Sequence, residues 1–120
     1  MTKIETLAPQ DNPLGALPVP LADVRAAHER IRGSIQHTPT AYSKTLSDLT
    51  GANVYLKFEN HQFTAAYKER GALNRLLLLD DASKAKGVIA ASAGNHAQGL
   101  AYHGKRLGVP VTIVMPHSTP

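Results

Sequence analysis

A lysine that follows a run of small residues is the first candidate for chemistry in this sequence. The stretch TAAYKERGALN, residues 64–74, places Lys68 where a helical pattern begins. The first turn of a helix carries a partial positive charge, which disfavours a protonated lysine but suits one that loses its proton to act as a nucleophile. Two interpretations stay open: an amine that forms a Schiff base with an aldehyde cofactor, or a solvated lysine that pairs with Glu59 across the loop.

A second candidate is the stretch ASAGNHAQG, residues 91–99, which joins an apolar segment to a helical pattern. Open α/β sheets bind their ligands at this place, where a strand ends and a helix starts. Gly94 permits a tight turn, the first N–H groups of the helix can hold a carboxylate, and Asn95 offers a donor and an acceptor. The alternative is an ordinary turn with Ser92 or Asn95 as the helix N-cap, and spacing alone does not separate the two.

No metal site is predicted. The chain has no cysteine, which excludes thiolate ligands and disulfides, and its six histidines form no H-E-x-x-H motif. His96 and His103 are two helical turns apart, and we interpret each as a packed or solvent-facing ring.

Hydrophobic spacing and end signals predict the elements that would position these residues. Helices are expected over 21–33, between Ser43 and Gly51, over 67–79 and over 94–108, strands over 53–58, 87–92 and 109–116, and a polar turn between 79 and 87. The first helix should pack through a face that runs from Leu21 to Ile31. Strands that are apolar throughout and joined by a helix indicate a βαβ unit in a parallel sheet covered on both faces, so the class is α/β. With three strands, that sheet keeps an open apolar edge.

Composition and charge narrow the function classes. With 42% hydrophobic and 18% charged residues, the sequence is typical of a soluble globular protein. The net charge of +4 arises after residue 81, where four lysines and arginines meet no acid. The scarcity of aromatic residues argues against a nucleic-acid surface, so an acidic small-molecule ligand or missing acidic sequence explains the charge better.

The composition of the first residues also bears on the order of this segment and on the cellular location of the protein. Residues 1–20 hold four of the eight prolines and no helical or strand period, so we expect a flexible leader there. This segment lacks the apolar core of a signal peptide, and no apolar run reaches membrane-spanning length. We therefore expect a cytoplasmic protein with no membrane partner.

Two stretches at this separation, YLKFENHQFTAAYKERGALNRL and GVIAASAGNHAQGLAYHGKRLGVPVTIVMP, resemble the N-terminal part of the threonine dehydratases (threonine ammonia-lyases). These are pyridoxal-phosphate enzymes of the tryptophan synthase β-like fold, fold type II. The resemblance implies that residues 21–120 are the truncated N-terminal part of such a catalytic domain. It further implies conversion of threonine or serine to a 2-oxo acid and ammonia, a role in isoleucine biosynthesis, and a homo-oligomer as the full-length protein.

The same resemblance implies roles for particular residues. Lys68 would form the Schiff base with pyridoxal phosphate and act as base and acid at the substrate, Asn95 would hydrogen-bond the cofactor's 3-hydroxyl, and Tyr67 would add a polar contact to the cofactor. The substrate carboxylate would be bound by the turn and the start of the next helix, that is, by Ser92, Ala93, Gly94, Asn95 and His96. Racemases of this fold look to carry a second catalytic serine where this chain has Ala93, which disfavours racemase activity.

The sequence departs from the family pattern in two ways. The residues before the lysine are usually T-G-S-F or T-A-S-F, whereas residues 64–67 are TAAY, which removes one hydroxyl and adds another. Family members hold the cofactor phosphate with a Gly-rich loop and the pyridine nitrogen with a later serine or cysteine, but no two of the nine glycines are adjacent here. We therefore expect weak cofactor binding and little turnover by the 120 residues alone.

Two alternatives remain at this point. One is another pyridoxal-phosphate enzyme of the same fold that eliminates or replaces a β-substituent, such as serine dehydratase or cysteine synthase. The other is a non-catalytic truncated module that associates through its open sheet edge.

Overall fold

The computed structural model describes residues 19–119, which form five α-helices and four short strands. The predicted leader therefore lies almost wholly outside the described residues. Along the chain the elements are α1 (Leu21–Ile31), β1 (Thr40–Tyr42), α2 (Lys44–Thr50), β2 (Tyr55–Lys57), α3 (Lys68–Leu77), α4 (Asp81–Lys86), β3 (Val88–Ala91), α5 (Asn95–Leu107) and β4 (Val111–Val114). Single 3-10 turns follow α1 and β2. None of the helices in this part of the chain is long and apolar enough to cross a membrane.

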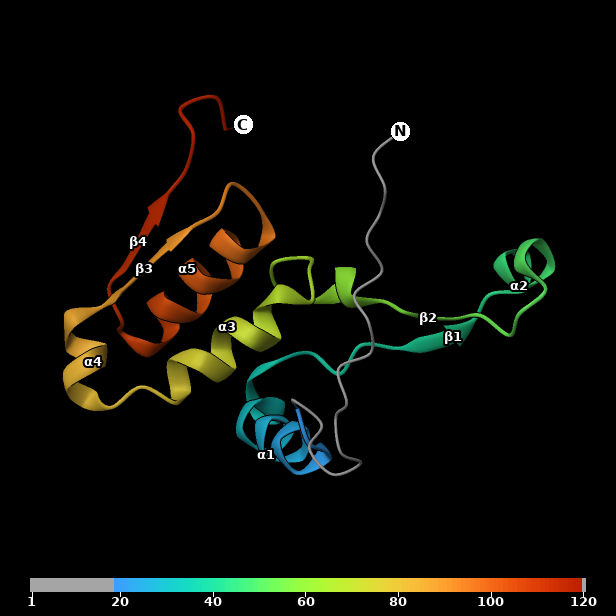
Figure 1. The fold of residues 1–120 in the computed structure, drawn as a ribbon, viewed down its shortest axis with the longest axis horizontal. Helices are drawn as coiled ribbons and strands as arrows, with labels where there is room; N and C mark the ends of the chain where they lie inside the picture. The colour runs from blue at the N-terminus through green and yellow to red at the C-terminus, as the bar shows by residue number, and fades with distance from the viewer. Residues whose placement is uncertain (1–18, 120) are drawn as a thin grey trace, which may run out of the picture.

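The predicted βαβ unit is confirmed. β3 and β4 pair in parallel, with Val88 opposite Val111 and Ala91 opposite Val114, and α5 connects them. Figure 1 shows α5 lying along this pair of strands, with α3 beside it. The core forms where the three meet, from Ala72, Leu76, Leu100 and Val109.

The predicted cover on both faces of the sheet is wrong for the described residues. Side chains alternate along β3 and β4 between partly buried and exposed, because α5 packs on one face and no described element packs on the other. Ile89 is 72% exposed and Val114 is 54% exposed. Apolar residues on the open face explain why the sequence pattern indicates a sheet buried on both sides.

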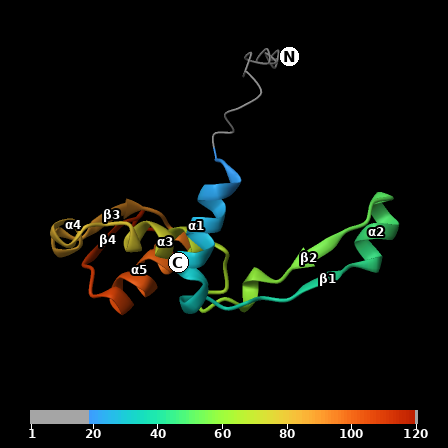
Figure 2. The same cartoon turned by 90° about the horizontal axis from the view of Figure 1, so that it is seen from below.

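The strand predicted over 53–58 forms, but it does not join the parallel sheet. Its central residues make β2, which pairs antiparallel with β1, so that Thr40 lies opposite Lys57 and Tyr42 opposite Tyr55. β1 is not predicted by the sequence, because three residues after a proline are too few to show a period of two. Figures 1 and 2 show that the hairpin and α2, which joins its strands, project away from α3 and α5.

Helices α1 and α2 form where their sequence signals predict, but the predicted burial of the apolar face of α1 is wrong for most of its residues. Ser43 caps α2 by accepting from the N–H of Leu46 at 3.4 Å, and Gly51 ends it in the left-handed conformation, as predicted. α1 forms where predicted, but only Ile31 of its apolar face is buried, and Leu21 and Val24 are exposed.

The polar turn predicted before β3 is instead the helix α4. The side chain of Asp80 accepts a hydrogen bond from the N–H of Ser83 at 2.7 Å and so caps the helix. Gly87 ends it with a φ of 83°, which a residue with a side chain rarely adopts. Six residues are too short for a helical period to appear, so the cap was the only available signal.

Candidate functional site

Lys68 is the first residue of α3, as the sequence predicts, and its side chain is exposed. Its Nζ lies 5.1 Å from the centre of the Tyr67 ring, a cation–π distance. Of the two interpretations left open, the ion pair between Lys68 and Glu59 does not form, because the carboxylate of Glu59 is held by Arg70 instead. Lys68 is therefore available to a ligand on the side where Tyr67 lies.

The segment before Lys68 makes a sharp turn at Ala65. This residue has a φ of 53°, the left-handed conformation that a Cβ disfavours. The pattern T-G-S-F-K puts glycine at this position, which needs no such strain. The N–H of Ala65 donates to the carbonyl of Gln62 at 3.0 Å, and the N–H of Thr64 donates to the carboxylate of Glu69. Lys68 is thus presented by a bent segment rather than by a relaxed helix entry.

The second stretch forms the predicted strand-to-helix turn. Gly94 occupies the N-cap position of α5, and the Ser92 hydroxyl accepts from the N–H groups of Gly94 and Ala97, each at 3.3 Å. The Ser92 hydroxyl thus satisfies N–H groups at the helix start, but the predicted N-cap, Ser92 or Asn95, is wrong because Gly94 holds that position. The N–H groups of Asn95 and His96 belong to the first turn, where a helix offers no internal acceptor. The positive end of α5 is suited to a carboxylate.

The two stretches meet because α3 and α5 pack closely at Gly99. A Cβ on Gly99 would lie 3.2 Å from the Glu69 nitrogen and 3.3 Å from the Glu69 Cα, closer than an ordinary contact. A residue with a side chain at this position would require the start of α3 to move by a few tenths of an ångström. This close approach fixes the separation between the lysine and the turn at residues 92–96.

A cavity of about 340 Å³ lies at this junction. Its lining combines both stretches: Tyr67, Lys68, Arg70, Gly71 and Ala72 from the first, and His96 from the second. The other predicted substrate-binding residues, Ser92, Ala93, Gly94 and Asn95, stand next to His96 in the chain but do not line the cavity. A second cavity of about 200 Å³ shares only Arg70 with this one and contains no residue of the 91–99 stretch.

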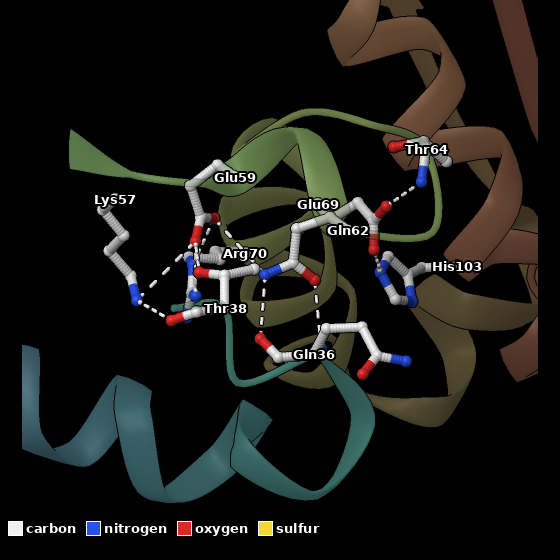
Figure 3. Close-up of polar contacts among 9 residues, drawn as sticks. All are labelled: Gln36, Thr38, Lys57, Glu59, Gln62, Thr64, Glu69, Arg70 and His103. Atoms are coloured by element: carbon white, nitrogen blue, oxygen red, sulfur yellow. Dashed lines mark hydrogen bonds and ion pairs between the residues drawn. The ribbon is translucent and has the colours of Figure 1, made fainter. Parts of the chain in front are cut away.

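Arg70 is a residue of the site that sequence reasoning missed. Its guanidinium donates two hydrogen bonds to Glu59, from Nε to Oε2 at 2.7 Å and from Nη2 to Oε1 at 2.8 Å, and Thr38 donates to the same carboxylate at 2.5 Å (Figure 3). The hydrogen bonds from Arg70 lower the pKa of Glu59 to about 2. Glu59 lies in the turn after β2 and Arg70 lies in α3, 11 residues later, so no periodic spacing in the sequence singled out this pair.

Metal ions are not suggested by the arrangement. Within residues 19–119, no three His, Asp or Glu side chains gather closely enough to hold one. His96 is partly buried at the cavity and His103 is fully buried in α5, which agrees with the packed or solvent-facing rings predicted for both.

Comparison with known proteins finds relatives that are similar in sequence over most of this chain. A catabolic L-threonine dehydratase, TdcB, from Staphylococcus aureus (strain N315) is 52% identical over 103 residues, which are 85% of this chain and 30% of that protein. An L-threonine ammonia-lyase from Thermotoga maritima is 44% identical over 102 residues, 85% of this chain and 25% of that protein. The chain thus spans less than a third of the length of these curated relatives.

Solved structures agree with the sequence comparison. The processed form of threonine deaminase isoform 2 from Solanum lycopersicum has a TM-score of 0.72 and 42% identity, over 83% of this chain and 29% of that one. Serine racemase from Dictyostelium discoideum has a TM-score of 0.79 and 39% identity, over 87% of this chain and 34% of that one. The fold is therefore that of the fold type II pyridoxal-phosphate enzymes, of which this chain carries a part. The family of pyridoxal-phosphate-dependent enzymes matches residues 31–120, and the chain belongs to it.

Proposed function

We propose that residues 21–120 form the N-terminal part of the catalytic domain of a threonine or serine ammonia-lyase. The observation that carries this proposal is the single cavity in which Lys68 from one stretch meets His96 from the other. The names of the dehydratase relatives support threonine as the substrate class.

The residues at the cavity fit pyridoxal phosphate. Lys68 offers a primary amine, which can combine with an aldehyde, and a Cβ built on Gly71 in the lining would meet no atom within 4 Å. The positive N-terminus of α5 lies on the other side of the junction, where an anionic group is favoured. Pyridoxal phosphate, when bound, draws electrons away from the Cα of an amino acid and so acidifies its α-proton.

The chain's own residues would then bind, orient and move protons. Lys68 would hold the cofactor covalently through Nζ and, once freed by the substrate, carry the α-proton. The amide of Asn95 would hydrogen-bond the 3-hydroxyl, and Tyr67 would contact the ring. The substrate carboxylate would be bound at the start of α5, by the hydroxyl or N–H groups of Ser92, Ala93, Gly94, Asn95 and His96.

The reaction conserves all atoms. Threonine loses its α-proton and its β-hydroxyl as one water molecule, and the resulting enamine becomes an imine that takes water back and releases ammonia. Threonine gives 2-oxobutanoate and serine gives pyruvate. No oxidant or reductant is required.

The location and wider role belong to the same proposal. We place the full-length enzyme in the cytoplasm as a homo-oligomer that serves isoleucine biosynthesis, without a membrane or nucleic-acid partner. The open apolar face of β3 and β4 supports further cover, either by more chain or by another copy.

Racemisation is the second candidate function, because two of the similar solved structures are named serine racemases and another an aspartate racemase. Ala93 argues against it, since alanine has no group that could hand a proton to the second face of the substrate. Enzymes that replace a β-substituent, and a non-catalytic module, are the remaining candidates. Substrate profiling separates an enzyme that replaces a β-substituent from a dehydratase. If the chain were a non-catalytic module, Lys68→Ala would not change its association.

The test is the visible absorption spectrum of the purified chain with pyridoxal phosphate, before and after borohydride reduction. Lys68→Ala is compared with Lys105→Ala, which removes another exposed lysine, from the last turn of α5. We expect a yellow band in the wild type and in Lys105→Ala, fixed by borohydride to the peptide that contains Lys68. A spectrum like that of the free cofactor in all three proteins would contradict cofactor attachment by these 120 residues, and a band retained in Lys68→Ala would contradict attachment at Lys68.

Turnover is measured separately, as 2-oxobutanoate formed from threonine. Because the chain has no adjacent glycines for a phosphate loop, we expect little or no product from the 120 residues alone and product from longer versions of the protein. Steady oxo-acid formation by the 120 residues would show that this part of the proposal is wrong.

A further inference from the structure

Glu69 and His103 are both fully shielded from solvent, and neither has a part in the proposed reaction. Glu69 directly follows Lys68 in α3, whereas His103 lies in α5. The Glu69 Oε2 atom is 3.5 Å from His103 Nε2, and neither atom has a hydrogen-bond partner among the described residues. Burying an acid beside an imidazole costs desolvation free energy. We therefore ask which contacts of the pair offset this cost and what they hold in place.

The pair connects the segment before Lys68 to α5. The second carboxylate oxygen of Glu69 accepts from the N–H of Thr64, so one acid bridges Thr64 and His103 (Figure 3). On the far side of the ring, Arg106 Nη1 lies 3.2 Å from His103 Nδ1. Arginine can only donate, so Nδ1 accepts and Nε2 carries the proton of the neutral ring, directed at Glu69.

Packing around the pair follows the same path. The ring of Phe63 stacks on Tyr102, the neighbour of His103, with centroids 5.3 Å apart. The backbone of Glu69 rests on Gly99, one turn earlier in α5. The segment from 63 to 69 therefore touches α5 at three places, and only the contact between Glu69 and His103 is polar.

The ring of His103 stays uncharged in this setting. Burial lowers the pKa of His103, the nearby charge of Arg106 lowers it further, and Glu69 opposes both. Glu69 from α3 and Arg106 from α5 are the charged groups that act on this ring, and Glu69 also raises the pKa of Arg70. The contact is thus a neutral N–H donor facing a carboxylate.

We infer that Glu69 and His103 are positioning residues, which hold the segment Thr64–Lys68 against α5 and so set the direction of the Lys68 amine. The left-handed conformation of Ala65 makes such a hold necessary, because the segment would otherwise relax away from it. The consequence for Lys68 rests on the proposed function, whereas the hold itself does not.

The first test needs no cofactor and measures hydrogen exchange of backbone N–H groups. Glu69→Leu removes the bridge, His103→Gln keeps a donor toward Glu69, and Leu76→Val is a control that weakens the core elsewhere in α3. In Glu69→Leu we expect the exchange rate of the N–H groups of residues 64–68 to rise on the order of tenfold more than the rates elsewhere in the chain. The reason is that this segment opens locally more often without the bridge. In His103→Gln it should stay near wild type, and in Leu76→Val it should rise evenly.

Two further observations keep this test decisive. If Glu69→Leu does not fold, Glu69→Gln replaces it, because glutamine still accepts from Thr64 but turns an amide donor toward the ring of His103. Nitrogen NMR of the wild type should show His103 neutral, with its proton on Nε2. Unchanged exchange over 64–68 in the folded variant, an even rise like that of Leu76→Val, or a proton on Nδ1 would overturn the inference.

The second test measures how fast the Lys68 amine combines with the aldehyde of pyridoxal phosphate in the same variants, with borohydride added at successive times to trap the product. Loss of positioning should slow this step by roughly 10- to 100-fold in Glu69→Leu, as misplaced reacting groups do, with His103→Gln and Leu76→Val close to wild type. Equal rates in all variants would overturn the positioning of Lys68. If no variant takes up the cofactor, the proposed function fails, and hydrogen exchange still decides whether the bridge holds the segment.

Discussion

Protonation of Glu59 should remove a large part of the stability of this chain in acid. Its pKa is lowered from 4.5 to about 2, chiefly by the hydrogen bonds from Arg70, and its side chain is only 16% exposed. At 1.36 kcal/mol per pH unit the difference amounts to about 3 kcal/mol. Because the pair keeps some contact with solvent, we expect about 2 kcal/mol in a measurement.

The sign follows from where the protons bind. The unfolded chain takes up a proton at Glu59 near pH 4.5, whereas the folded chain does so only near pH 2. The contribution is therefore complete above about pH 4.5 to 5 and is lost as the pH falls toward 2. Urea unfolding between pH 7 and pH 2.5 measures it as the difference between the wild type and Glu59→Gln.

A matched control removes a carboxylate that also faces an arginine but at the surface. Glu29 lies 2.9 Å from Arg32 with both side chains more than 60% exposed, so Glu29→Gln should change stability by less than about 0.5 kcal/mol. Glu59→Gln should lose about 2 kcal/mol at pH 7 and approach the wild type near pH 2.5. If the free energies of unfolding of the wild type and Glu59→Gln differed by the same amount at every pH, the reasoning would be refuted.

Three backbone substitutions have outcomes that the geometry decides. Ala65→Gly relieves the left-handed conformation and should raise stability by about 1 kcal/mol in thermal unfolding; a loss would contradict the assigned φ. Gly71→Ala meets no atom within 4 Å and should stabilise α3 by up to about 1 kcal/mol, yet reduce cofactor uptake because its methyl group enters the cavity. Gly104→Ala would place a methyl group against Val111 and should cost about 1–3 kcal/mol, so a more stable variant would show that α5 and β4 can separate freely.

What the sequence predicts well in this protein is what local chemistry controls. Ser43 and Gly51 bound α2 as their side-chain properties require, and the apolar segments around the 94–108 helix give the parallel pair β3 and β4. Lys68 begins α3 as its neighbours indicate. Each of these predictions depends on residues close together in the chain.

The features that the sequence did not predict depend on contacts between residues far apart in the chain, or on whether another surface covers a helix. The spacing of Leu21 and Val24 correctly predicts a helix, but nothing in that spacing states whether a second surface covers it. The ion pair of Arg70 required knowing that the loop at Glu59 folds back onto α3, and proximity in sequence favoured Lys68 instead. The same holds for Glu69 and His103, which are 34 positions apart and meet where α3 packs closely on α5 at Gly99.

The order Lys68, Glu69, Arg70 explains how one exposed lysine can be held in a fixed direction. Successive helical residues point about 100° apart, so these three side chains leave α3 in different directions. Glu69 is anchored on α5 through His103, and Arg70 is anchored on Glu59. A rotation of α3 that moved Lys68 would have to break both anchors, each of which is costly to leave unpaired. The lysine can therefore stay free for chemistry while its neighbours in the sequence supply the rigidity that the chemistry needs.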